Sequence, residues 1–336
     1  MIFRQMYDSE TSTYTYLLAD ETTKEAILID SVLEQVERDL KVLKELDLNL
    51  KYLMETHVHA DHITGITKMK AFFPQAKSVL FNDSGNISAD LYSYDNQEFD
   101  FGNHKIKVLS TPGHTNGCVS YYIEGMVFTG DALLIRGTGR TDFQQGSPEK
   151  LYNSITNRLF TLPDETIVYP GHDYKGMESS TIAEEKQFNP RLAGKTKEDF
   201  IEIMNNLNLP YPKKIQASVP ANIVSGDMNY DGRIKTVSVT EALELHNNNP
   251  HFIFIDVREP FEWEQGVIPN IKKISLGNLP NELDSLDKNE NYIMVCRSGG
   301  RSGKATSILM EAGFKNVYNM AGGMIDWNNH EYITEV

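Results

Sequence analysis

Cysteine is scarce in this sequence, and its scarcity excludes a scaffold held together by disulfide bonds. Only Cys118 and Cys296 occur among the 336 residues, which is too few for a disulfide framework. Cys118 lies on a predicted strand, where a buried and inert thiol is the expected use. Cys296 lies in a polar loop and is the better candidate for a reactive thiol.

Long apolar runs and an excess of basic residues are also absent. The first residues lack the apolar core of a secretory signal, and no segment approaches the roughly 18 apolar residues of a membrane helix. The 47 acidic residues outnumber the 32 basic ones and give a net charge of -15, which argues against a nucleic-acid surface. We therefore expect a protein of the cytoplasm or of an organelle matrix that binds neither nucleic acid nor membranes.

The order of predicted strands and helices indicates an α/β protein with two domains. At 336 residues the chain is long for one core, since domains commonly have about 100 to 200 residues. Residues 1–226 place strands and helices in two halves, which suggests an αββα sandwich of four layers. A polar linker is predicted at 227–234. Residues 235–336 then alternate strands with helices, the pattern of a small, mostly parallel, doubly wound domain.

Several predicted strands of the first domain end directly before polar turns. The strands are predicted at 13–18, 26–30, 50–54, 78–81, 106–109, 119–123, 126–128 and 167–169. The helices between and after them are predicted at 33–43, 62–73, 147–161, 178–188 and 196–207. Side chains in the polar turns are therefore expected to meet at one edge of the sheets.

Seven side chains in these turns are metal ligands by type: His57, His59, Asp61, His62, His114, Asp131 and His172. Neutral imidazoles and carboxylates suit zinc, iron, manganese and similar ions, and an aspartate can bridge two of them. These residues by themselves leave open whether one or two ions bind. They also leave open whether the chemistry is hydrolysis or oxygen chemistry.

The surroundings of the ligands carry a family resemblance. Residues 1–226 resemble the metallo-β-lactamase superfamily. Within it, the stretches that resemble the persulfide dioxygenase branch are Ala132–Gly146, Asn189–Leu192, Asn206–Pro210 and Val219–Asn222. This resemblance implies that a thiol persulfide, such as glutathione persulfide, is oxidised by O2 to sulfite and free thiol. It also implies a homodimer or higher homo-oligomer.

The same resemblance implies one iron(II) ion per chain, held by two histidines and one carboxylate: His57, His114 and Asp131. This is the facial arrangement of oxygen-using non-haem iron. The remaining residues of the cluster, which bind metal in two-metal relatives, would orient the three ligands: His59, Asp61, His62 and His172. Arg140 is a candidate to bind a carboxylate of the thiol carrier, and Tyr174 could supply a hydroxyl near it. A surface ion pair and a packed aromatic ring are the alternative uses of these two residues.

The loop around Cys296 is the second chemical feature of the sequence. It follows a predicted buried strand at 292–295 and precedes a predicted helix at 304–310. Backbone amides around Gly299 and Gly300 at a helix N-terminus form a cradle for anions, which favours a thiolate. Cysteine phosphatases build a similar cradle. The flanking segments Asp256–Trp263 and Gly322–Trp327 make the region from about 235 to 336 resemble the rhodanese sulfurtransferases instead.

The rhodanese resemblance implies that Cys296 carries sulfane sulfur as a persulfide. The loop residues implied to bind an anionic donor such as thiosulfate or sulfite are Arg297, Ser298, Gly299, Gly300 and Arg301. We therefore predict a persulfide dioxygenase fused to a rhodanese sulfurtransferase. One alternative is a thioester hydrolase of the hydroxyacylglutathione type with two metal ions. In another, Cys296 only accepts sulfur for delivery to a partner protein.

Overall fold

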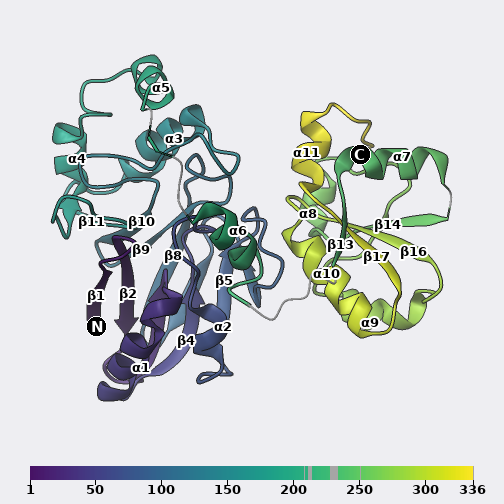
Figure 1. Ribbon diagram of the computed structural model, residues 1–336, viewed down its shortest axis with the longest axis horizontal. Coiled ribbons are helices and arrows are strands. Elements are labelled where there is room, and N and C mark those ends of the chain that lie inside the picture. The colour runs from purple at the N-terminus through teal and green to yellow at the C-terminus, as the bar shows by residue number, and fades with distance from the viewer. Residues whose placement is uncertain (208, 211–213, 228–233, 250, 336) are drawn as a thin grey trace. The chain divides into compact units, whose positions relative to one another are not determined.

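The computed structural model describes residues 1–207, 209–210, 214–227, 234–249 and 251–335, and the chain divides into two compact units (Figure 1). The first unit comprises Met1–Ser84 and Asp90–Asp227, and the second comprises Gly85–Ala89 and Met228–Val336. The linker predicted at 227–234 lies largely outside the described residues. Among the described residues, no helix combines the length and the apolar character needed to cross a membrane.

Two six-stranded sheets form the first unit. The first sheet has the order β1 (Ile2–Asp8), β2 (Thr13–Ala19), β3 (Glu25–Ile29), β4 (Asn49–Met54), β5 (Lys77–Phe81) and β6 (Leu91–Ser93). The second has the order β12 (Ser180–Thr181), β11 (Ile167–Pro170), β10 (Met126–Gly130), β9 (Val119–Ile123), β8 (His104–Ser110) and β7 (Glu98–Phe101). β3 to β5 pair in parallel, as do β10 and β11. Parallel pairing brings the carboxyl ends of these strands to the same edge of each sheet.

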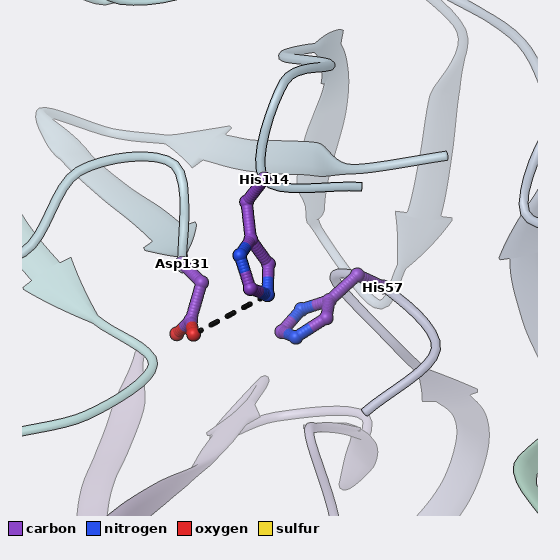
Figure 2. Close-up of side chains that lie close together, drawn as sticks. All are labelled: His57, His114 and Asp131. Carbon is purple, nitrogen blue, oxygen red and sulfur yellow. Dashed lines mark ion pairs between the residues drawn. The ribbon is translucent and has the colours of Figure 1, made fainter. Parts of the chain in front are cut away.

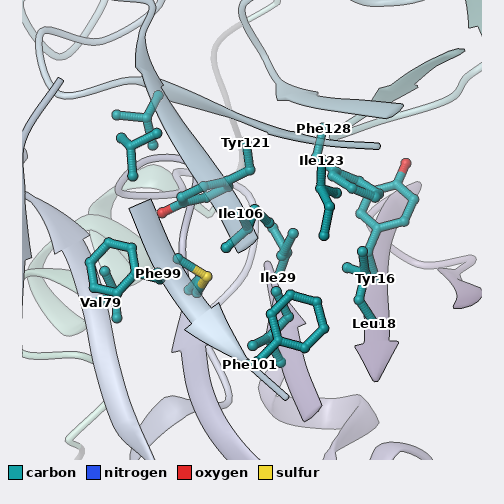
Figure 3. Close-up of a cluster of buried hydrophobic side chains, with 14 of the residues drawn as sticks. Tyr16, Leu18, Ile29, Val79, Phe99, Phe101, Ile106, Tyr121, Ile123 and Phe128 are labelled. Carbon is teal, nitrogen blue, oxygen red and sulfur yellow. The ribbon is translucent and has the colours of Figure 1, made fainter. Parts of the chain in front are cut away.

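The main core of the first unit lies between the two sheets (Figure 3). Successive residues of a strand point to opposite faces, and β8 and β10 show this directly. Val108 and Phe128 join the cluster between the sheets, whereas Leu109 and Val127 join a second cluster with Leu151 and helical residues that follow it. Burying each such side chain stabilises the fold by about 1.5–3 kcal/mol. The predicted αββα sandwich is thereby confirmed.

Six α-helices accompany these sheets in the described part of the first unit: α1 (Val36–Glu45), α2 (Ile66–Lys70), α3 (Pro148–Ser154), α4 (Ile182–Phe188), α5 (Lys197–Asn205) and α6 (Ile215–Ile223). A π-helical turn, Ile155–Leu159, continues α3. The helix predicted at 62–73 is wrong in its bounds. Thr64 forms a β-bridge with Val32, and the amide of Gly65 donates to the carbonyl of Ser31. These bonds hold the chain before Ile66 outside a helix.

The second unit has one parallel sheet of five strands, in the order β13 (Lys235–Val237), β17 (Asn316–Met320), β16 (Asn291–Val295), β14 (Phe252–Asp256) and β15 (Lys272–Lys273). Its helices are α7 (Val239–Asn248), α8 (Pro260–Trp263), α9 (Leu279–Glu282), α10 (Gly300–Glu311) and α11 (Gly323–Asn329). Tyr292 and Met294 of β16 pack in one cluster with residues of α10, and Ile293 and Val295 pack in another with residues of α7 and α11. Both faces of the sheet are therefore buried, which confirms the doubly wound prediction.

Candidate functional site

Strand ends bring three predicted ligands of the first unit together (Figure 2). His57 follows β4 of the first sheet, while His114 and Asp131 follow β8 and β10 of the second. One potential ligand atom from each of the three residues lies within 4.8 Å of the other two. Nε2 of His114 is 3.5 Å from Oδ2 of Asp131. The group spans both sheets, so its geometry depends on how the sheets pack.

Neighbouring groups orient the ring of His57. Its Nδ1 lies 2.9 Å from Oγ1 of Thr56, and that hydroxyl donates to Oδ2 of Asp30 over 2.8 Å. Because the hydroxyl proton points to Asp30, the Thr56 oxygen accepts from Nδ1–H of His57, which leaves Nε2 with a free lone pair. Burial, aided by the nearby rings of His59 and His114, lowers the pKa of His57 well below its ordinary value. His57 is therefore a neutral imidazole, the form that binds metal ions.

His114 is oriented by the segment that follows Asp131. Its Nδ1 lies 2.7 Å from the carbonyl oxygen of Arg140, which can only accept. The proton is therefore on Nδ1, and Nε2 is free to bind. Gly139 makes this approach possible, because a Cβ atom there would lie 2.3 Å from the carbonyl oxygen of Asp131 and 2.9 Å from Nδ1 of His114. The Gly139–Arg140 sequence thus shapes the ligand group.

The three residues fit a divalent metal ion. Two imidazoles present Nε2, and Oδ1 of Asp131 is buried without a hydrogen bond in the described part of the chain. A buried carboxylate oxygen without a hydrogen bond is costly unless a cation or donor reaches it. Two imidazole nitrogens and one carboxylate suit iron, zinc and related ions.

A second group of potential ligands, His59, Asp61 and His62, also lies within 4.8 Å of one another. Nε2 of His59 is 3.2 Å from Oδ1 of Asp30 and 3.2 Å from Oε2 of Glu55. Burial by itself would lower the pKa of His59, but the two carboxylates raise it well above its ordinary value. A carboxylate beside one ring nitrogen commonly orients a histidine whose other nitrogen binds metal, so this second group keeps the ligand types of a second metal site.

His172 lies between the two ligand groups. Its Nε2 is 3.5 Å from Oδ1 of Asp131 and 3.7 Å from Oδ2 of Asp61. Burial would lower the pKa of His172, but these two carboxylates raise it. The ring of Tyr174 stacks beside His172, with 10° between their planes. Tyr174 as a whole residue is 69% exposed.

A cavity of about 600 Å³ opens onto the ligands, and Arg140, Tyr174 and Arg191 line it. The Arg140 guanidinium already forms an ion pair within the chain. Its Nε and Nη2 lie 2.6 and 2.7 Å from the carboxylate oxygens of Asp142, and its Nη1 donates to the carbonyl of Pro210 over 2.8 Å. Binding of a carrier carboxylate to Arg140 would have to displace Asp142.

Arg191 is a cavity residue that the sequence reasoning did not single out. Its Nη1 donates to the carbonyl of Thr138 over 2.7 Å and to Oγ1 of Thr138 over 3.0 Å. It forms no ion pair within the described part of the chain, and burial lowers its pKa. Only the resemblance of the stretch Asn189–Leu192 could have drawn attention to it. A half-buried guanidinium without an acidic partner is suited to receive a ligand carboxylate.

In the second unit, Cys296 directly follows β16 and is fully buried. Its Sγ accepts from the amide of Gly299 over 3.1 Å and lies 3.2 Å from Oγ of Ser302. Gly299 has φ +98°, which side chains rarely tolerate, and caps α10. The other cysteine lies in the first unit and differs: burial raises the pKa of Cys118 to about 12, so its thiol stays protonated at neutral pH.

Two flanking segments support the Cys296 loop. From one side, the amides of Met324 and Ile325 donate to the carbonyls of Cys296 and Arg297 over 2.8 and 2.9 Å. From the other, Arg301 is buried and its Nη1 and Nη2 bind both carboxylate oxygens of Glu262, at 2.6 and 2.8 Å. The sequence reasoning expected Arg301 to bind an anionic donor. The structure pairs its guanidinium with Glu262 of α8 because that carboxylate is buried beside it, while Arg297 is exposed.

Comparison with known proteins adds the family context. The metallo-beta-lactamase superfamily model matches residues 9–78 and 83–172, and the rhodanese-like domain model matches residues 238–330. The mitochondrial persulfide dioxygenases ETHE1 of Mus musculus and Homo sapiens are each 47% identical over 228 residues, covering 67% of this chain and 89% of theirs. The crystal structure of ETHE1 from Myxococcus xanthus is 56% identical, has a TM-score of 0.66, and covers 67% of this chain and all of that one.

Proposed function

Because the chain belongs to the persulfide dioxygenase family of the metallo-β-lactamase superfamily and carries a rhodanese-like domain, we propose that it oxidises a thiol persulfide and also transfers sulfane sulfur. The first reaction consumes one persulfide, one O2 and one water, and yields one thiol and one sulfite. The second exchanges sulfur among thiosulfate, sulfite and a thiol. The carrier thiol is glutathione or a related low-molecular-weight thiol.

The observation that carries the dioxygenase proposal is the group of two histidines and one carboxylate: His57, His114 and Asp131. Bound there, one iron(II) ion per chain would supply the redox chemistry with O2 and the persulfide sulfur. The protein would hold the histidines in the correct tautomer through Thr56 and the Arg140 carbonyl.

The cavity supports a carrier that bears carboxylates. Arg191 is a half-buried cavity cation with no acidic partner among the described residues, so we propose that it binds one carboxylate of the carrier. Arg140, which sequence reasoning assigned to this task, would bind it only by releasing Asp142. Tyr174 would offer its hydroxyl at the rim. A volume of about 600 Å³ is within the usual range for small-ligand sites.

In the second unit, the Cys296 thiolate would attack the outer sulfur of thiosulfate. A sulfur–sulfur bond forms to Cys296, the bond to the sulfonate sulfur breaks, and sulfite leaves with the electron pair. A carrier thiolate then attacks the outer sulfur of the Cys296 persulfide, which releases carrier persulfide and restores the thiolate. The amide of Gly299, which donates to Sγ, would stabilise the thiolate, and Ser298, Gly300 and Arg297 would face the anionic donor.

An oxygen electrode tests the proposal directly, with glutathione persulfide as substrate and protein of measured metal content. We expect persulfide-dependent oxygen uptake with about one iron per chain. Cys296→Ser should abolish exchange between thiosulfate and thiol, by about 10³-fold or more, and leave oxygen uptake intact. Two metal ions per chain with thioester hydrolysis and no oxygen uptake would instead establish the hydrolase that the His59, Asp61 and His62 group would permit.

A further inference from the structure

The end of helix α6 contacts the loop that carries the first histidines. Asn222 is buried in this helix, and its Nδ2 donates to the carbonyl oxygens of His59 and His62 over 2.9 and 2.7 Å. Its Oδ1 accepts from the amide of Thr64 over 2.9 Å. One side chain, about 160 residues away in sequence, thus satisfies three backbone groups of this loop.

The residues after Asn222 extend the contact. Thr67 Oγ1 and the Thr67 amide donate to the carbonyl of Ser225 over 2.8 and 3.3 Å. Gly226 has φ +73°, and a Cβ atom there would lie 2.5 Å from the carbonyl oxygen of Thr64. The backbone of 222–226 therefore packs directly against the chain from His59 to Thr67, with no room for a side chain at the closest point.

The loop is held at both ends by partners that differ in chemistry. At its start, Asp30 accepts from the amide and the hydroxyl of Thr56 over 2.7 and 2.8 Å. At its end, Asn222 donates to two carbonyls and accepts from one amide. Buried backbone groups require such partners, and an asparagine side chain offers both donors and an acceptor. An aspartate at 222 would lose both donors and place negative charge against two carbonyl oxygens.

We propose that Asn222 is a positioning residue for metal binding: it holds the carbonyls of His59 and His62 so that the histidine loop presents its side chains to the metal centre. The proposal rests on the proposed function only in taking His57 and its neighbours as the metal centre. It makes α6 part of the active machinery without contact to substrate or metal. Loss of such an indirect partner commonly lowers metal affinity or activity by about 10- to 100-fold.

The test compares metal retention in the full-length protein for Asn222→Asp and for Asn153→Asp, a matched change at an exposed position of α3. Iron(II) release to a competing chelator is followed, together with the electron paramagnetic resonance spectrum of the ferrous protein treated with nitric oxide. We expect Asn222→Asp to weaken iron binding by about 10- to 100-fold and to alter the spectrum, whereas Asn153→Asp matches the unaltered protein. Unchanged affinity and spectrum in folded Asn222→Asp would overturn the proposal.

If Asn222→Asp does not fold, the same measurements on Thr67→Val test the proposal. This change removes only the hydrogen bond from the Thr67 hydroxyl to the Ser225 carbonyl at the same contact. A smaller loss of iron affinity in the same direction supports the proposal, and unchanged affinity contradicts it. Metal retention is measured without persulfide. If the unaltered protein binds iron but shows no persulfide-dependent oxygen uptake, the proposed function fails while the inference about Asn222 is still tested.

Discussion

The metal centre and the Cys296 loop differ in how their parts are distributed along the chain. The three metal-binding candidates follow β4, β8 and β10, and the rings of His57 and His114 are each oriented by another residue, Thr56 and Arg140. At the thiol loop, two groups that hydrogen-bond the Cys296 sulfur follow it within six residues: the amide of Gly299 and the hydroxyl of Ser302 in the first turn of α10. A dispersed site depends on sheet packing and on remote partners. A contiguous loop depends on its own backbone and on what holds that backbone in place.

The largest expected effect tests whether the two centres act separately. His114→Ala removes a direct ligand candidate, so the loss of iron and of persulfide-dependent oxygen uptake should exceed the about 10- to 100-fold typical for indirect partners. Exchange between thiosulfate and thiol should be unchanged, because Cys296 lies in the other unit. Metal analysis, an oxygen electrode and a sulfur-transfer assay measure the three quantities. An equal loss of sulfur transfer in His114→Ala would contradict the view that the two centres act separately.

The next effect concerns the support of the contiguous loop. Glu262→Gln removes the carboxylate charge that both Nη atoms of the buried Arg301 bind, which should cost about 3–5 kcal/mol in the free energy of unfolding of the second unit. Trp263 and Trp327 are the two tryptophans of the chain, and both lie in this unit. Tryptophan fluorescence during denaturant unfolding therefore reports on it selectively. Glu264→Gln, at an exposed position, is the control and should leave the denaturant midpoint of unfolding unchanged.

The same pair predicts a pH dependence. Burial alone would raise the pKa of Glu262, but the hydrogen bonds and charge of Arg301 lower it below its ordinary value of 4.5. Because the folded-state pKa is depressed, the stabilisation is fully present above pH 4.5 and is lost as the pH falls through the folded-state pKa. Glu262→Gln should remove this part of the acid sensitivity. An identical acid response in the variant would contradict the assignment.

The smallest of these effects tests the hydroxyl that orients one ligand ring of the dispersed site. Thr56→Val keeps the shape of the side chain but removes the hydroxyl between His57 Nδ1 and Asp30. Without its acceptor, His57 can adopt the other tautomer, so iron affinity should fall by about 10- to 100-fold. Competition with a chelator measures the change, and Thr22→Val, at an exposed position, is the control. Unchanged affinity would mean that packing alone orients the ring.

The sequence was most informative where function depends on residue type and on position relative to strands. Because His57, His114 and Asp131 follow predicted strands, we expected their side chains to meet at one edge of the sheets. In the structure their potential ligand atoms lie within 4.8 Å of one another. In the structure, successive residues of β8 and β10 likewise join two different buried clusters. Both features follow from strand geometry, which is local and has a period of two residues.

Only the tertiary structure decided which partner each long or polar side chain meets. Arg140 pairs with Asp142, the surface ion pair that was the alternative to ligand binding, and Arg301 pairs with Glu262, although the sequence implied that Arg301 binds an anionic donor. The contact of Asn222 with the histidine loop joins segments about 160 residues apart. A flexible side chain takes the complementary group that folding places within reach, and that distance is not encoded in local spacing. The sequence by itself determined the types of the metal ligands and the two folds. Tertiary packing determined which charged side chains form ion pairs within the chain.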